Sequence, residues 1–152
     1  MRRVIGLDVG DKTLGVAVSD ELGLTAQGVT TCRRTSSAAD LDFLRQIIAQ
    51  YAAAAVVVGL PKNMDGSIGP QAQKTLAFIE RLRQTCAIPV VAWDERLTTR
   101  EAERVLLAAN TSRQRRKRVR DRLAAQLILQ SYLEWSRRHP ESSPPEDNAL
   151  SS

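Results

Sequence analysis

The sequence holds few of the residues that most metal and redox sites require. Among its 152 residues there are two cysteines, Cys32 and Cys86, and one histidine, His139. A zinc site of the usual kind needs about four clustered cysteine or histidine ligands, which three widely separated residues do not supply. Two cysteines do not imply a disulfide framework either. A histidine base would have to be His139, at the start of a polar tail, so we expect chemistry based on carboxylates, hydroxyls or lysines.

Long apolar runs and aromatic residues are also scarce. The longest apolar stretch, residues 52–60, is far shorter than the roughly 20 residues that span a bilayer. Asp8 and Asp11 interrupt the apolar run that a signal peptide would need after a basic start. Aromatic residues make up 4% of the chain, so base stacking cannot dominate recognition of a nucleic acid. These absences predict a cytoplasmic protein without a membrane partner.

Positive charge, in contrast, is concentrated in one place. The chain carries a formal net charge of +5, and segment 113–122 has seven basic residues against the single acid Asp121, so the remaining residues sum to −1. A cluster of this density attracts polyanions, although a solvated, flexible turn is the alternative. We predict that it binds nucleic acid through Arg113, Arg115, Arg116, Lys117, Arg118 and Arg120.

The hydrophobic pattern predicts alternating strands and helices in one domain. Strands are expected at residues 3–9, 14–19, 28–32, 55–59 and 89–93, and helices at residues 38–51, 71–85, 99–109 and 119–137. Ser36 or Ser37 is expected to cap the first helix. This order indicates an α/β sheet with helices on its faces. The domain is expected to cover residues 1–138, followed by a disordered polar tail over residues 139–152.

Acidic residues stand at three places in the chain where packing alone would not put them. Asp8 lies inside an apolar strand, Asp94 and Glu95 close another strand, and Asp121 aligns with the apolar stripe of the last helix. A desolvated carboxylate is costly unless it is paired or binds a cation, and Mg²⁺ takes carboxylate oxygens. The pattern therefore predicts a metal site. Neighbours on a strand point to opposite faces, so one of Asp94 and Glu95 should reach it, and the spacing does not select which.

Each acid also has an ordinary structural interpretation. Asp8 could be a hydrogen-bonded turn residue at the end of its strand, and Asp121 could cap a helix that begins there. Glu95 could pair with Arg96 or Arg100. The spacing of the acids alone does not decide between these interpretations and a shared metal site.

Four segments resemble, in order, the motifs of the YqgF family, also called RuvX-like. They are IGLDVG (5–10) with GVAVSD (15–20), VGLP (58–61) followed by Asn63, Asp65 and Gly66, DERLTT (94–99), and DRLAA (121–125) with Ile128 and Leu129. The match runs from about Arg3 to Leu133. The segment at 111–120 departs from the family pattern in being richer in arginine, which makes bidentate phosphate contacts that lysine does not.

The resemblance implies a ribonuclease-H-like fold: a five-stranded mixed sheet, its first three strands antiparallel, flanked by helices. It implies a metal-dependent nuclease that processes the 5′ end of pre-16S rRNA, or alternatively a Holliday junction resolvase acting on branched DNA. Carried over by position, the catalytic and metal-binding acids are Asp8, Glu95 and Asp121, with Mg²⁺ or Mn²⁺ as cofactor. The resemblance thus favours Glu95 over Asp94. No organic cofactor is expected.

Further substrate contacts and alternative functions complete the predictions. Lys12, Lys62, Asn63 and Arg96 are expected to contact nucleic acid, because they lie in turns and loops close to the acids. A non-catalytic rRNA-binding assembly factor is the alternative from another class. A nucleotide phosphotransferase is a third, but the chain lacks the second domain that closes over ATP. A monomer and a homodimer are both compatible with the sequence.

Overall fold

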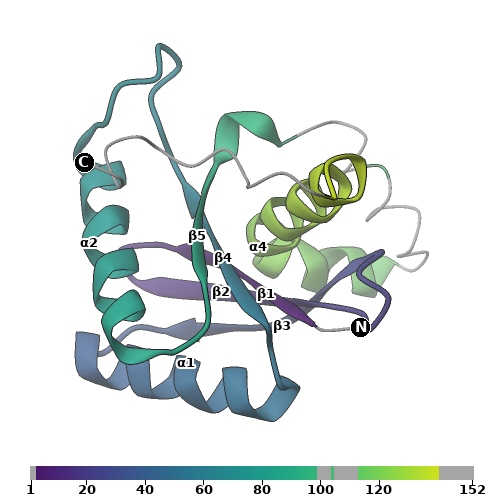
Figure 1. The fold of residues 1–152 in the computed structure, drawn as a ribbon, viewed down its shortest axis with the longest axis horizontal. Coiled ribbons are helices and arrows are strands. Elements are labelled where there is room, and N and C mark those ends of the chain that lie inside the picture. Colours follow the sequence, from purple (N-terminus) through teal and green to yellow (C-terminus); the bar gives the residue numbers. More distant parts are fainter. Residues whose placement is uncertain (1–2, 99–103, 105–112, 141–152) are drawn as a thin grey trace.

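The structure is a computed structural model that describes residues 3–98, 104 and 113–140, with only the backbone described for 113–122. A five-stranded sheet forms its centre, with helices on both faces (Figure 1). The strands lie in the order β3–β2–β1–β4–β5. Their bounds are β1 Val4–Val9, β2 Thr13–Ser19, β3 Ala26–Arg33, β4 Ala55–Leu60 and β5 Val90–Asp94.

The pairing of the strands agrees with the predicted mixed sheet. β1 pairs with β2, and β2 with β3, in antiparallel register, whereas β4 runs parallel to both β1 and β5. β1 is therefore the central strand, with a partner on each side. Because β1, β4 and β5 are parallel, their carboxyl ends meet at one edge of the sheet.

Helices α1 and α2 cover one face of this sheet. α1 (Ser37–Tyr51) begins where the side chain of Ser36 accepts a hydrogen bond of 3.1 Å from the amide of Ala39, which settles the choice of cap in favour of Ser36. α2 (Pro70–Thr85) begins with proline, whose missing N–H costs nothing at a first helical position. Both helices lie within one residue of their predicted bounds.

Helix α4 (Arg113–Arg138) covers the other face, and its start corrects the prediction. The helix was expected from residue 119, with a flexible charged turn as the alternative for the basic segment. Instead the backbone is helical from Arg113 onward, since arginine, lysine and glutamine are good helix formers even without an apolar stripe. The predicted helix at 99–109 falls almost entirely outside the described residues, as does the tail from 141 onward.

The face toward α1 and α2 is built from large aliphatic side chains. The inward residues alternate along each strand, as expected for period-2 packing. All of those in β1, β2 and β4 are buried and belong to one cluster that also takes in Leu44 of α1 and Phe78 of α2: Ile5, Leu7, Val9, Leu14, Val16, Val18, Val56, Val58 and Leu60. This cluster is the main hydrophobic core.

On the face toward α4, two strand positions have no side chain. A Cβ atom at Gly6 would lie 2.6 Å from Cβ of Leu129, and one at Gly59 would lie 2.3 Å from Cδ1 of Ile128. Real Cβ atoms do not approach so closely, so these glycines let α4 pack directly against the strands. The close packing places one side of the helix against the carboxyl end of β1.

Aromatic side chains complete the packing between this second face and α4. Trp93 is 1% exposed, and its ring packs edge-on against Tyr132 and Trp135 of α4, so it is a core residue. Trp135 is half-buried and stacks on His139 at a centroid distance of 4.6 Å. The lone histidine therefore packs against the end of α4.

Candidate active site

Asp8 projects from the central strand toward α4. Its partner in β2 is Gly15, which has no side chain to fill the space beside the carboxylate, and in β1 it follows Leu7, whose partner in β4 is Val58. The side chain is half-buried, and this burial raises its pKa. Among the described residues nothing donates a hydrogen bond to the Asp8 carboxylate or forms an ion pair with it. Asp8 lies inside β1 and has no hydrogen-bond partner among the described residues, so its interpretation as a satisfied turn residue is wrong.

Glu95 reaches the same place from the end of β5. The strand ends at Asp94, and the chain continues directly into a short 3₁₀ helix, η1 (Glu95–Leu97). This change of direction places Glu95 next to α4. A Cβ at Gly59 would lie only 2.6 Å from Oε1 of Glu95, so the absence of a side chain there makes room for the carboxylate. Burial, followed by the charges of Asp8 and Asp94, raises the pKa of Glu95 to about 7.

Asp94 has a different role from its neighbour. Its carboxylate caps η1 by accepting from the amide of Arg96, binds the Arg96 guanidinium at 2.7 Å, and lies 4.0 Å from Nζ of Lys62. Burial opposes ionisation of Asp94, but the hydrogen bonds and charge of Arg96, with the charge of Lys62, outweigh it and lower the pKa. The expected alternative pairing of Glu95 with Arg96 is wrong, because Arg96 is bound to Asp94. Arg100 lies outside the described residues.

Asp8 and Glu95 line one recess between the edge of the sheet and α4. Its volume is about 270 Å³, and its other walls are Thr98 and three residues of α4: Ala124, Leu127 and Ile128. Asp121 is one helical turn before Ala124 and Ala125, well inside the helix, so it is not the N-cap considered above. Its side chain lies outside the described part of the chain. The described side chains thus bring two acids together, and no group of three metal-ligating residues occurs among them.

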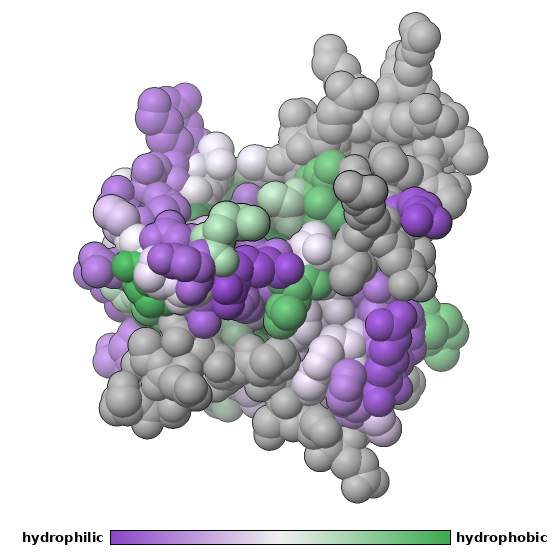
Figure 2. All heavy atoms as spheres, turned by 90° about the horizontal axis from the view of Figure 1, so that it is seen from above, coloured by the Kyte–Doolittle hydropathy of each residue, from purple (hydrophilic) through white to green (hydrophobic). Residues whose placement is uncertain are grey.

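The loop from β4 to α2 stands beside these acids. Asn63 is exposed and donates from Nδ2 to Oγ of Ser67 at 2.9 Å, and Arg96 donates from Nη1 to the carbonyl of Met64 at 3.4 Å. Lys62, bound near Asp94, is half-buried. Seen from above, on the side to which β5 and η1 rise, the described surface is mainly hydrophilic with small separate apolar patches (Figure 2).

The remaining predicted contacts with nucleic acid fall in two places. Lys12 is exposed on the turn between β1 and β2, four residues after Asp8. The basic residues of the cluster all lie in the first part of α4, and their side chains are outside the described part: Arg113, Arg115, Arg116, Lys117, Arg118 and Arg120. The structure therefore brings Lys62 and Arg96 together at Asp94, next in sequence to Glu95, and places the cluster on α4, the helix that also lines the recess.

Two site residues were missed in the sequence, Gly6 and Gly59. Both make room for α4, and Gly59 also makes room for Glu95. A signal was present, because a glycine inside an apolar strand often marks close approach of another backbone or side chain.

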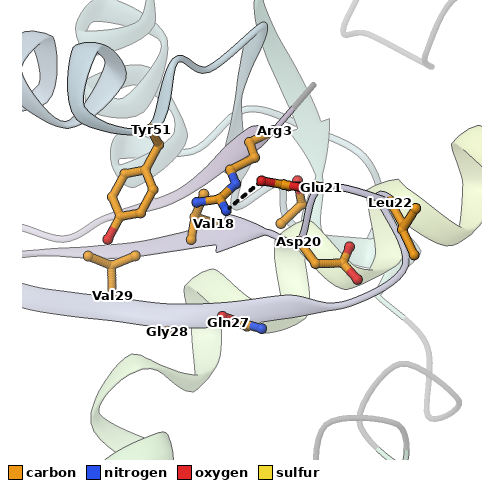
Figure 3. Close-up of a pocket in the computed structure, with 10 residues that line it drawn as sticks. Arg3, Val18, Asp20, Glu21, Leu22, Gln27, Gly28, Val29 and Tyr51 are labelled. Carbon is orange, nitrogen blue, oxygen red and sulfur yellow. Dashed lines mark hydrogen bonds and ion pairs between the residues drawn. The ribbon is translucent and has the colours of Figure 1, made fainter. Parts of the chain in front are cut away.

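A second recess, of about 470 Å³, lies at the opposite end of β1 (Figure 3). There Arg3 pairs with Glu21 at 3.4 Å, and its guanidinium lies 5.7 Å from the centroid of the Tyr51 ring. The carboxylate of Asp20 accepts from the amide of Leu24 at 2.7 Å. The acids of this recess have partners, whereas Asp8 and Glu95 have none among the residues that the structure describes, so this recess does not offer a second uncompensated carboxylate pair.

The comparisons with solved structures identify the fold. Thermus thermophilus RuvC in complex with a Holliday junction substrate superposes with a TM-score of 0.64 at 14% identity, over 95% of this chain and 100% of that one. The yeast mitochondrial Holliday junction resolvase Ydc2 gives a TM-score of 0.54 at 10% identity, over 90% of this chain and 81% of that one. At these identities the likeness shows the fold alone, which is the predicted ribonuclease-H-like one.

Among the described helices, none has the length and apolar composition that a bilayer crossing demands.

Sequence comparison identifies the family. A protein of Thermoanaerobacter pseudethanolicus named "Putative pre-16S rRNA nuclease" is 55% identical over 133 residues, which are 87% of this chain and 96% of that protein. A protein of the same name from Symbiobacterium thermophilum is 53% identical over 141 residues, 93% of this chain and 98% of that protein. The family profile described as "RuvX: Holliday junction resolvase" matches residues 2–135. The chain belongs to the RuvX family.

Proposed function

We propose that this protein is a metal-dependent nuclease that hydrolyses phosphodiester bonds in structured nucleic acid, and that its substrate is the 5′ end of precursor 16S rRNA. One observation carries the proposal: two desolvated carboxylates, Asp8 and Glu95, share a recess with no counter-cation from the described residues. The name of the relatives supports the choice of substrate. A cytoplasmic location follows from that substrate.

The residues present suit a divalent cation. Carboxylate oxygens are the ligands that Mg²⁺ and Mn²⁺ prefer, and two buried acids that repel each other are stabilised by a cation between them. Asp8 and Glu95 would hold it, with Asp121 as the third ligand from α4. When bound, such ions activate a water and stabilise the leaving oxygen in phosphodiester hydrolysis.

The chain's own basic residues would hold the substrate. Lys62 of the β4–α2 loop and Arg96 of η1 both lie at Asp94, the neighbour of Glu95, and Lys12 stands on the turn after Asp8. Together with the basic residues in the first part of α4, they would bind the phosphates of the substrate. Contacts of this kind position a nucleic acid without reading its sequence.

The test is cleavage by the purified chain with Mn²⁺, using precursor 16S rRNA and a synthetic four-way DNA junction in parallel. Asp8→Asn, Glu95→Gln and Asp121→Asn should each abolish cleavage and leave binding of the nucleic acid largely intact. Asp42→Asn is the matched control, because Asp42 is an exposed acid on α1, on the other face of the sheet. Undiminished cleavage by the three site variants would reject the assignment.

The same experiment separates two other candidate functions. The fold neighbours and the family description favour a junction resolvase as the second candidate. A resolvase must cut matched strands symmetrically, so it should cleave the junction faster than the RNA and sediment as a dimer. A non-catalytic rRNA-binding factor would instead bind the RNA and cut neither substrate.

A further inference from the structure

A buried ion pair lies behind the turn that follows Asp8. Arg34, just after β3, donates from Nε to Oδ2 of Asp40 in α1 at 2.9 Å. Its Nη1 donates to the carbonyl of Gly10 at 2.8 Å, and its guanidinium lies 5.2 Å from the centroid of the Phe78 ring in α2. One guanidinium thus joins the turn between β1 and β2 to both helices on the far face of the sheet.

The main chain of Arg34 holds the same turn a second time. Its amide donates to the carbonyl of Lys12 at 2.8 Å. Arg34 therefore binds the two carbonyls that stand on either side of Asp11. The turn closes on itself through a hydrogen bond of 2.9 Å from the amide of Gly10 to the carbonyl of Thr13. These contacts fix the backbone between the Asp8 carboxylate and the Lys12 side chain.

Stability alone does not account for this pair. The side chains of Arg34 and Asp40 are 22% and 5% exposed, so both charges have lost much of their hydration. A buried ion pair can often be replaced by apolar residues of similar size without loss of stability. What apolar residues cannot supply is a planar fork of donors in fixed directions. The geometry of the turn is the property that depends on arginine.

We propose that Arg34, held in place by Asp40, is a positioning residue that sets the β1–β2 turn so that Asp8 meets the metal and Lys12 meets the substrate phosphate. This inference rests on the proposed nuclease function and adds two residues to it. Neither residue touches the recess, so each acts through the turn.

The test compares Mn²⁺ binding by calorimetry in variants of the full chain. Arg34→Met together with Asp40→Leu replaces the pair by apolar side chains, and Arg34→Lys keeps the charge but loses the fork. Arg45→Met is the matched control, because it breaks an exposed pair with Asp42 on the same helix. We expect the double variant to melt near the wild-type temperature and to bind Mn²⁺ about 10- to 100-fold more weakly, as when an outer partner of a metal ligand is lost.

Two further measurements separate positioning from a general loss of structure. Exchange of the Gly10 amide, which donates to the carbonyl of Thr13, should accelerate in both Arg34 variants and not in Arg45→Met. Cleavage should fall in kcat, with a smaller change in KM. If the double variant does not fold, Arg34→Lys decides the matter by the same readouts.

The outcomes are distinguishable from failure of the proposed function. Wild-type protein that binds no Mn²⁺ would overturn the nuclease proposal itself. Wild-type protein that binds Mn²⁺, with Arg34→Lys and the double variant binding it as tightly as Arg45→Met, would overturn only the role of Arg34.

Discussion

Leu7 and Asp8 are neighbours in β1, yet they lie on opposite faces of the sheet. Leu7 is fully buried among the branched aliphatic residues that face α1 and α2. Asp8 faces α4. Glycines and alanines take the place of large side chains there, and neither Asp8 nor Glu95 has a basic partner among the described residues. The first face is apolar throughout β1, β2 and β4. The second also has buried apolar residues such as Trp93, but beside Asp8 it gives up side-chain volume and hydration of charge to keep a recess open. Sites of this kind commonly cost their protein stability.

The largest effect is expected from Asp8→Asn, on the face toward α4. We expect cleavage to fall at least ~100-fold, beyond the losses typical of residues that only support a metal ligand. In the presence of a chelator, the melting temperature should rise, because a desolvated carboxylate has been removed. Added Mn²⁺ should stabilise the wild type and leave the variant unchanged. Equal stabilisation of both proteins by Mn²⁺ would contradict the placement of the metal.

Leu7→Ala should have the opposite effect, lowering the stability of the fold and leaving cleavage nearly unchanged. Truncation of a fully buried leucine costs about 2–5 kcal/mol of unfolding free energy, as measured by urea titration. Cleavage per folded molecule, measured well below the melting temperature, should stay close to the wild-type rate. A large loss of activity in the folded variant would show that the two faces are not independent.

The pH dependence of stability is expected to reflect the burial of Glu95 on the face toward α4. The pKa of Glu95 is raised from 4.5 to about 7, so between these values the unfolded chain loses the proton while the folded chain keeps it. Metal-free stability should therefore fall as the pH rises from about 4.5 to 7, by up to about 3 kcal/mol, and level off above that. Thermal melts in a chelator across this range measure the slope, and Glu95→Gln should flatten it. A slope unchanged in that variant would assign the titration to another group.

The smallest effects concern the glycines under α4. Gly6→Ala places a Cβ 2.6 Å from Leu129 and should destabilise by about 1–3 kcal/mol, the usual cost of overpacking. Gly15→Ala is the matched control, because its Cβ would meet Asp8 and Ala125 at an ordinary 3.5 Å. Its unfolding free energy should stay within about 0.5 kcal/mol of the wild type. Equal losses in the two variants would indicate that α4 is not seated on Gly6.

The strands and the first two helices could be predicted within two residues, since their periodicity is strong. The start of α4 could not, because the basic segment has no apolar stripe and its helix depends on propensity. The alternation of side chains along a strand could not decide whether Asp94 or Glu95 reaches the recess. The reason is that the strand ends at Asp94, and a 3₁₀ turn changes the direction of the next residue. The contact between Arg34 and Gly10 joins segments 24 residues apart, which periodicity does not reveal.

The position of β1 in the middle of the sheet has a consequence for how the protein loses activity. A middle strand is shielded on both sides, so its amides exchange with solvent only when the whole domain opens. Asp8 belongs to that strand. Heating should therefore inactivate the protein and melt it in one step. We expect no earlier phase in which the domain is still folded but Asp8 has left its place.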